Sequence, residues 1–238
     1  MTRPAWCWRS RGVRATEHEA ELTVAPDLLE AVPVTGRVVT GDALYCQRAL
    51  CRRVLERGGD YFVAVAGNQP RLYDDLYWLF EWPAPGETFR ASSSHDQHGD
   101  RRERRRLWAS TALTDYLDWP GAQQVCKVER RRKQAGQVST EVAYAITSLG
   151  PQTAPAELLA IWRGHWSIEN RLHYVRDVTL GEDASHIRTG AAPQVMAALR
   201  NTTVALLRRA GYTNLAAGLR ATGWQAGAAL ALLGIQLP

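Results

Sequence analysis

The stretch RVVTGDALYCQRALCRRVLERGGDYFVAVAGNQPRLYDDLYWLF, residues 37–80, decides the fold class. It contains two short runs rich in β-branched, alanine and aromatic residues, at 37–44 and 60–66, of the kind that forms buried strands. Each run is followed by a segment with apolar residues at helical spacing, at 47–57 and 72–80. The alternation of strand and helix with short connections predicts an α/β sheet covered by helices.

The segments on either side of this stretch differ from it in composition. Residues 1–20 have little apolar periodicity and predict an irregular segment, whereas residues 21–81 predict part of an α/β core. Residues 82–150 alternate strand-like pieces with turns and predict a β-rich insert, and residues 151–238 have helical periodicity. We expect a short helix at 27–31 capped by Asp27, insert strands at 88–93, 104–110, 123–130 and 138–147, and later helices at 154–178, 191–210, 213–221 and 224–233.

Composition narrows the class of protein. Hydrophobic residues make up 45% and charged residues 22% of the 238-residue chain, which is typical of a globular domain. No apolar run approaches the roughly 18 residues of a membrane span, and the first residues have no apolar core of a secretory signal. We therefore expect a cytoplasmic protein with no membrane partner, in which four cysteines are free thiols: Cys7, Cys46, Cys51 and Cys126.

Positive charge is concentrated within the predicted insert. The net charge is +5, and basic residues form two runs, at 101–106 and 130–133. Each run alone is compatible with a solvated face or turn. Two runs in one segment favour contact with phosphates of a nucleic acid.

An acid and a polar helix are the candidates for chemistry. Asp42 follows the first predicted strand, at the sheet edge where α/β proteins place their sites, although it could also cap the next helix. Further along, Trp162, His165, Glu169, His173 and Arg176 recur at three- and four-residue steps, so they share one helix face. That face could instead be an exposed polar network. The two histidines are about 12 Å apart along such a helix, too far to bind one zinc ion. Carboxylates from a strand end and a helix suit Mg²⁺, and two such ions catalyse phosphodiester chemistry.

Four segments resemble a known family: VVTGDALYCQRAL, GGDYFVAVAGNQP, HGDRRERRRLWAS and RGHWSIENRLHYVRDVTLGEDASHIRTG. They are similar to insertion-sequence transposases of the ISAs type, which include H-repeat-associated proteins, and the similarity runs from about Glu19 to the C-terminus. The resemblance implies a ribonuclease-H-like DDE transposase fold with a β insert and a C-terminal helical region. It implies DNA cleavage and strand transfer at insertion-sequence ends, with two Mg²⁺ or Mn²⁺ ions.

The resemblance also assigns residues. Asp42 would be the second acid of the triad and Glu169 the third. Trp162, His165, Glu169 and Arg176 would occupy the places of the superfamily's Tyr, Arg, Glu and Lys signature, and Ala66 stands where the family has Lys. The first acid has no counterpart in residues 1–20, which contain no Asp. We therefore expect an N-terminally truncated chain with an incomplete sheet, weak or no catalysis, and a tendency to self-associate.

The expected partners are transposon ends and target DNA, in a nucleoid-associated protein. Trp108, beside the first basic run, could stack on an extruded base or simply pack in the core. Three other readings remain open: a non-catalytic DNA-binding or regulatory fragment, a metal-dependent nuclease without strand transfer, and a product with no function. We expect DNA contacts from Asn68, Gln69, Arg101, Arg102, Arg104, Arg105, Arg106, Arg163, His165, Asn170, His173 and Arg176.

Overall fold

A computed structural model describes residues 21–168 and 174–235 of the chain. These residues belong to two compact units, which we call the sheet unit, ending at His165, and the helical unit, beginning at Trp166. None of the helices in the described ranges is long and apolar enough to cross a membrane.

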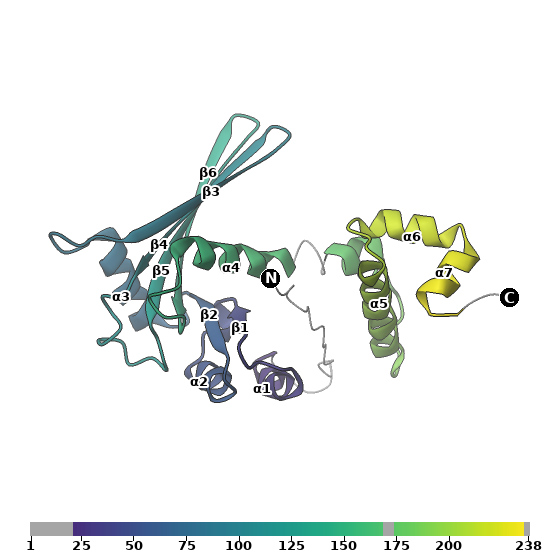
Figure 1. Cartoon of the computed structure of the whole chain (residues 1–238), viewed down its shortest axis with the longest axis horizontal. Helices are drawn as coiled ribbons and strands as arrows, with labels where there is room; N and C mark the ends of the chain where they lie inside the picture. Colours follow the sequence, from purple (N-terminus) through teal and green to yellow (C-terminus); the bar gives the residue numbers. More distant parts are fainter. Residues whose placement is uncertain (1–20, 169–173, 236–238) are drawn as a thin grey trace. The chain divides into compact units, whose positions relative to one another are not determined.

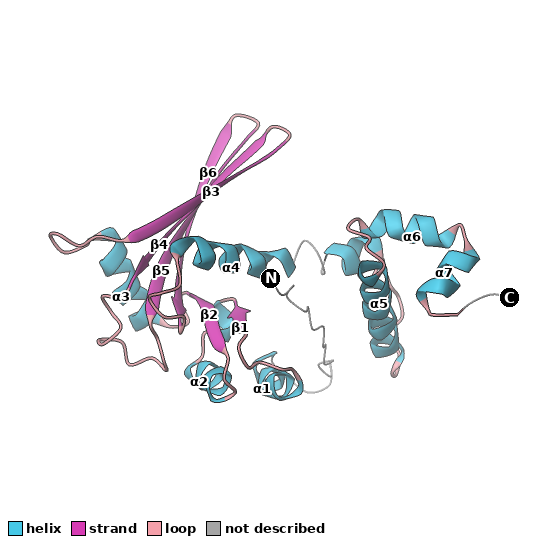
Figure 2. Cartoon of the chain, in the orientation of Figure 1, coloured by secondary structure: helices cyan, strands magenta, loops and turns pink. Residues whose placement is uncertain are grey.

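The sheet unit is built on one six-stranded sheet with the order β1-β2-β6-β5-β4-β3 (Figures 1 and 2). β1 and β2 are parallel, and every other neighbouring pair is antiparallel. The far ends of the β3–β4 and β5–β6 hairpins project beyond the helices (Figure 1). The strands are β1 (Val38–Gly41), β2 (Asp60–Val65), β3 (Arg90–His98), β4 (Arg101–Ser110), β5 (Gln124–Gln134) and β6 (Gln137–Thr147).

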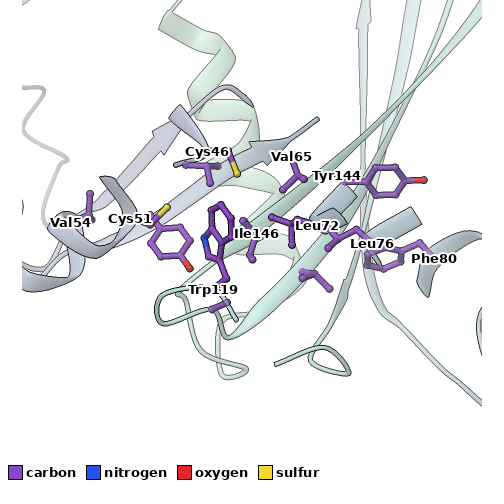
Figure 3. Close-up of a cluster of buried hydrophobic side chains, with 14 of the residues drawn as sticks. Cys46, Cys51, Val54, Val65, Leu72, Leu76, Phe80, Trp119, Tyr144 and Ile146 are labelled. Carbon is purple, nitrogen blue, oxygen red and sulfur yellow. The ribbon is translucent and has the colours of Figure 1, made fainter. Parts of the chain in front are cut away.

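Helices cover both faces of the sheet near β2. On one face α2 (Arg48–Glu56) and α3 (Pro70–Glu81) bury apolar side chains against the strands, as Figure 3 shows. On the other face α4 (Pro155–Ile168) packs Leu158, Leu159 and Trp162 onto Phe62 and the middle strands. The YFVAV run of β2, residues 61–65, is therefore continuously apolar because it is buried on both sides, as predicted from the sequence.

The residues expected as a separate β-rich insert continue the core sheet. β6 pairs with β2 in the register Phe62↔Thr147. Side chains reinforce this junction: Thr147 Oγ1 donates to the Tyr61 carbonyl at 2.6 Å, and Ser148 Oγ accepts from the Tyr61 N–H at 2.9 Å. Residues 82–150 are β-rich as predicted, but their strands and the core strands form a single layer.

Several predicted boundaries differ from the structure, and β5 is among them, since it ends at Gln134 and not at residue 130. α1 spans Glu21–Ala31, so Asp27 lies inside the helix and does not cap it. Pro26 suggested a helix start because it lacks the N–H of an interior helical bond, but burial of Ala25 and Leu29 holds the helix through it. The strands β3 and β4 also run further than expected, since the turn between them is limited to Gly99 and Asp100.

The helical unit has its own small core. Val204, Leu207 and Leu215 are buried, with Val175, Leu180 and Leu232 among the side chains packed around them. The single helix expected at 154–178 is described as α4 up to Ile168 and as a π-helix from Val175; residues 169–173 lie outside the described part. The elements of this unit are η3 (Val175–Thr179), α5 (Ala192–Arg209), α6 (Leu215–Gly223) and α7 (Ala226–Leu232).

Candidate functional site

Asp42 is exposed directly after β1, at the end of the strand. Its Oδ1 accepts a hydrogen bond from the Leu44 N–H at 3.0 Å and so caps the short 3-10 helix η1 (Ala43–Tyr45). The turn is tight, because a Cβ at Gly41 would lie 2.8 Å from Tyr45 Cβ. Asp42 therefore does cap the helix that follows it, which was one of the two predicted alternatives. It leaves the second carboxylate oxygen available to a ligand.

Two amide side chains hold the turn that follows Asp42. Asn68 Nδ2 donates to the Ala43 carbonyl at 2.5 Å, and Gln69 Nε2 donates to the Cys46 carbonyl at 2.9 Å. Both residues come from the connection between β2 and α3. Their predicted contact with DNA is untested, whereas the described contacts give them a positioning role beside Asp42.

The C-terminal part of α4 lies against β1. His165 Nδ1 and Thr40 Oγ1 are 3.2 Å apart, which places His165 beside the strand that leads to Asp42. Trp162 is buried on Phe62, with ring centroids 5.7 Å apart, so this signature position contributes to the core. Three further predicted site residues lie outside the described residues: Glu169, Asn170 and His173.

The described residues supply only part of a metal site. Residues 21–168 and 174–235 hold no cluster of three or more His, Cys, Asp or Glu side chains suited to a metal ion. Asp42 offers one hard oxygen donor, which suits Mg²⁺ but is one ligand of several that this ion needs. Cys46, Cys51 and Cys126 are free, as predicted, and burial raises the pKa of the first two thiols to about 12 and about 11. These thiols are therefore protonated at neutral pH.

The first basic run divides between the two faces of β4, because successive strand residues point to opposite faces. On the face toward α4, the Glu103 side chain is only 4% exposed and accepts hydrogen bonds from Arg101 at 2.5 Å and Arg130 at 2.7 Å. Arg105 forms a third ion pair with Glu103. Burial alone would raise the pKa of Glu103, but the bonds from Arg130 and Arg101 and the charge of Arg105 lower it below its ordinary value.

This ion-pair cluster extends to α4. Asp96 on β3 accepts from Arg105 at 2.7 Å and from Arg163 at 2.9 Å.

In the helical unit, Arg176 binds both oxygens of Glu182 at 2.5 Å. The predicted DNA contacts of Arg101, Arg105, Arg163 and Arg176 are untested, but carboxylates of the same chain offset these four charges.

The opposite face of the same hairpins carries an excess of positive charge, although Glu129 also lies on it, in register with Arg106. Arg102 is paired in register with Lys133, and Arg104 with Arg131, so like charges stand directly across the strands. Within the described ranges, no carboxylate lies at ion-pair distance from these side chains. We define the basic face by its exposed cations: Arg102, Arg104, Arg106, Arg131 and Lys133.

A shallow depression of about 330 Å³ lies within the basic face. Its lining includes Arg104, Arg131 and Lys133. The carboxylates of Asp96 and Glu103 also line it, but arginines on the other face already bind them. Like-charged pairs cost stability in isolation, so this arrangement suits an anionic partner.

Trp108 lies at the base of this face and is partly buried against the core. The Arg106 guanidinium lies over its ring at 4.5 Å from the centroid, and Lys127 Nζ at 5.5 Å. These contacts support the packing alternative for Trp108. An incoming base would first have to displace a cation from the ring.

Comparison with known proteins agrees with this architecture. The family model described as "Transposase DDE domain" matches residues 11–207. The chain belongs to that transposase family, and its α/β fold is of the ribonuclease-H-like type, as the sequence resemblance implied.

Similar individual proteins include one that is named a transposase. The chain is 31% identical over 207 residues to "H repeat-associated putative transposase YhhI" of Escherichia coli (strain K12), covering 82% of this chain and 53% of that protein. The same identity and coverage hold for "Putative protein YbfL" of that strain. A protein of Xanthobacter autotrophicus, "Uncharacterized protein in dhlA 3'region", is 37% identical over 131 residues, covering 54% of this chain and 44% of that protein. The chain spans about half the length of the first two relatives, and its assignment to the ISAs type remains a prediction.

Proposed function

We propose that this protein binds the DNA of an insertion sequence through the basic face and takes part in DNA cleavage and strand transfer at its ends. Membership of the DDE transposase family supports a role in transposition. The proposed DNA contact rests on how the arginines are distributed between the two faces of the sheet. On the face toward α4, Arg101, Arg105 and Arg130 are paired with carboxylates, whereas the cations of the basic face are exposed and form no ion pair among the described residues.

The basic face is suited to phosphate and not to base edges. Its cations project from a sheet, at about 6.6 Å between alternate residues of one strand, and present charge along a line. Arginine and lysine contacts of this kind position DNA without reading its sequence. We therefore expect binding that depends strongly on salt and weakly on sequence.

The proposed chemistry rests on two acids. Asp42 has a free carboxylate oxygen at the end of β1, and the contact between His165 and Thr40 brings α4 beside that strand. Glu169 follows α4 in the sequence and is the second proposed ligand of Mg²⁺ or Mn²⁺. When bound, such an ion would polarise the scissile phosphodiester.

A second candidate function is a non-catalytic DNA-binding or regulatory protein. The capping bond of Asp42 favours it, since that bond gives the carboxylate a structural task that does not require catalysis. The basic face lies wholly within the sheet unit and needs neither acid. Both candidates therefore share the same DNA contact and differ only in chemistry.

One experiment tests the shared contact. We would compare the wild-type chain with the double variant Arg104→Glu and Arg131→Glu in a gel-shift assay on linear duplex DNA. The matched control is Arg52→Glu together with Arg71→Glu, which makes the same charge change at exposed residues of α2 and α3. A large loss of binding in the first variant only supports the proposal. Equal losses in both variants would show that net charge, and not the basic face, governs binding.

A further inference from the structure

Three aromatic side chains lie exposed at the C-terminal end of α3. Tyr77 is 38% exposed, Trp78 is 59% exposed and Trp82 is 70% exposed. Their rings contact one another, with centroids 5.5 Å apart for Tyr77 and Trp78 and 6.5 Å apart for Trp78 and Trp82. The core side of α3 is already formed by Leu72, Leu76 and Phe80. We call Tyr77, Trp78 and Trp82 the aromatic strip; most of its area is free of the core.

Described contacts connect the aromatic strip to the basic face. Lys127, which lies over Trp108 beside Arg106, forms an ion pair with Glu81 at 2.6 Å. Glu81 lies at the end of α3, one residue before Trp82. The two features therefore lie on the same side of the sheet and are connected by partly buried side chains.

A second set of contacts joins the aromatic strip to Glu81, through Tyr144. Tyr144 Oη donates to Glu81 Oε1 at 2.7 Å, and the Tyr144 ring lies 6.4 Å from that of Tyr77. The hydrogen bond from Lys127 lowers the pKa of Glu81 and the ion pair offsets its charge. The junction between the basic face and the strip therefore does not repel a phosphate chain.

We propose that the aromatic strip stacks on unpaired bases of a DNA whose duplex portion lies on the basic face. This inference rests on the proposed function and narrows its substrate to DNA with a single-stranded segment next to a duplex. Aromatic side chains bind single strands because every base has a π-face, and adjacent cations hold the backbone. Trp78 and Trp82 supply two exposed rings one helical turn apart. The positive charge comes from the basic face, to which Glu81, Lys127 and Trp108 connect them.

Charge decides between a nucleic acid and a protein partner for this strip. Exposed tryptophans are also common in protein interfaces, where the surrounding surface is depleted in charge. Here the strip lies on the same side of the sheet as a face with an excess of cations, which complements a polyanion. Towards the start of α3 the surface turns acidic, with Asp74 one turn before Trp78. A nucleic acid would therefore lie from the strip towards the basic face.

The test compares two DNAs that share one duplex. One is blunt, and the other carries a thymidine tail on one strand; binding of the full chain is measured by fluorescence anisotropy of labelled DNA. For the double variant Trp78→Ala and Trp82→Ala, we expect affinity for the tailed DNA to fall about tenfold or more, and affinity for the blunt duplex to change less than about twofold. Trp224→Ala is the matched control, because Trp224 is 90% exposed in the helical unit.

Further variants separate the possible outcomes. The double variant Trp78→Phe and Trp82→Phe keeps two aromatic faces, so it should restore most of the binding to tailed DNA. Equal affinity changes for tailed and blunt DNA in the alanine variant would overturn the inference, as would a shift in oligomeric state without a change in DNA binding. If the Arg104 and Arg131 variant still loses duplex binding in that case, the proposed function stands and only the aromatic strip is excluded. If neither set of variants affects binding, both proposals fail.

Discussion

Glu103 on β4 and Arg130 on β5 form an ion pair across the strands, with Arg130 Nε 2.7 Å from a carboxylate oxygen whose side chain is only 4% exposed. The pair holds Arg130 on the face toward α4, and Arg131, the next residue, belongs to the basic face. A single buried acid thus separates structural arginines from those available to a ligand.

Removal of this acid should destabilise the sheet unit. In Glu103→Gln, three partly buried guanidinium groups lose the carboxylate that they share: those of Arg101, Arg105 and Arg130. We expect the free energy of unfolding to fall by about 3 kcal/mol. Urea unfolding followed by circular dichroism measures this. Glu129→Gln is the control, since that half-exposed acid lies on the neighbouring strand β5; an equal loss there would contradict a special role for Glu103.

The same acid predicts how stability depends on pH. The pKa of Glu103 is lowered in the folded protein, so its contribution is present above the ordinary carboxyl pKa of about 4.3 and is lost as pH falls through the lower folded value. Wild-type stability should therefore decrease on acidification below about pH 4, and Glu103→Gln should decrease less steeply. Urea midpoints at pH 3 to 7 compare the two slopes. Parallel curves would show that Glu103 is not the titrating group.

The basic face predicts a defined change in salt dependence. Each phosphate contact contributes about 0.9 to the slope of log K against log salt concentration on duplex DNA. Arg104→Ala should reduce that slope by about one unit, with a similar loss for every duplex sequence. Arg101→Ala is the contrasting variant, because Arg101 is paired with Glu103. A full unit of slope lost there would mean that the pairing does not set the faces apart.

Asp42 can be tested separately as a cap and as a catalytic acid. Asparagine caps helices as well as aspartate, so Asp42→Asn should keep the stability of the wild type, while Asp42→Ala loses about 1 kcal/mol. If Asp42 is a metal ligand, both variants lose Mn²⁺-dependent nicking of supercoiled plasmid, as does Glu169→Gln. Nicking that persists in Asp42→Asn would restrict Asp42 to capping. DNA shifted on a gel without nicking by any form would favour the non-catalytic candidate.

The turn at Gly41 should tolerate no side chain. A Cβ there would lie 2.8 Å from Tyr45 Cβ, so Gly41→Ala must displace the turn that presents Asp42. We expect a loss of about 1–3 kcal/mol, measured as a lower urea midpoint. Gly67→Ala is the matched control, because a Cβ at Gly67 meets nothing within 4 Å. Equal effects of the two substitutions would contradict the steric argument.

Periodicity predicted the strands and most helices because burial alternates regularly along them. The DYFVAV run and the helix at 72–80 are confirmed by β2 and α3. The strand order was not predictable, since the β2–β6 pairing joins segments whose compatibility depends on the completed core. Pro26 within α1 shows the same limit, because tertiary burial overrode a local preference.

The candidate site was predicted less completely than the fold. The sequence showed both basic runs, but not how the residues of each run divide between the two faces of the sheet. That division depends on the strand register, which the linear sequence does not give. The aromatic strip was also missed. Its residues fall outside the helical pattern of Leu72, Leu76 and Phe80, and their exposure is known only once α3 is docked on the sheet.

The pairing of β2 with β6 has a consequence for synthesis on the ribosome. Thr147 donates to the carbonyl of Tyr61, a residue made 86 positions earlier. At about 5–20 residues per second, β2 therefore emerges roughly 4–17 seconds before its antiparallel neighbour exists. During that interval its apolar edge is open to strands of other nascent chains. The yield of folded protein should thus depend on translation speed and chaperone supply, because β2 must wait for β6 before the two strands can pair.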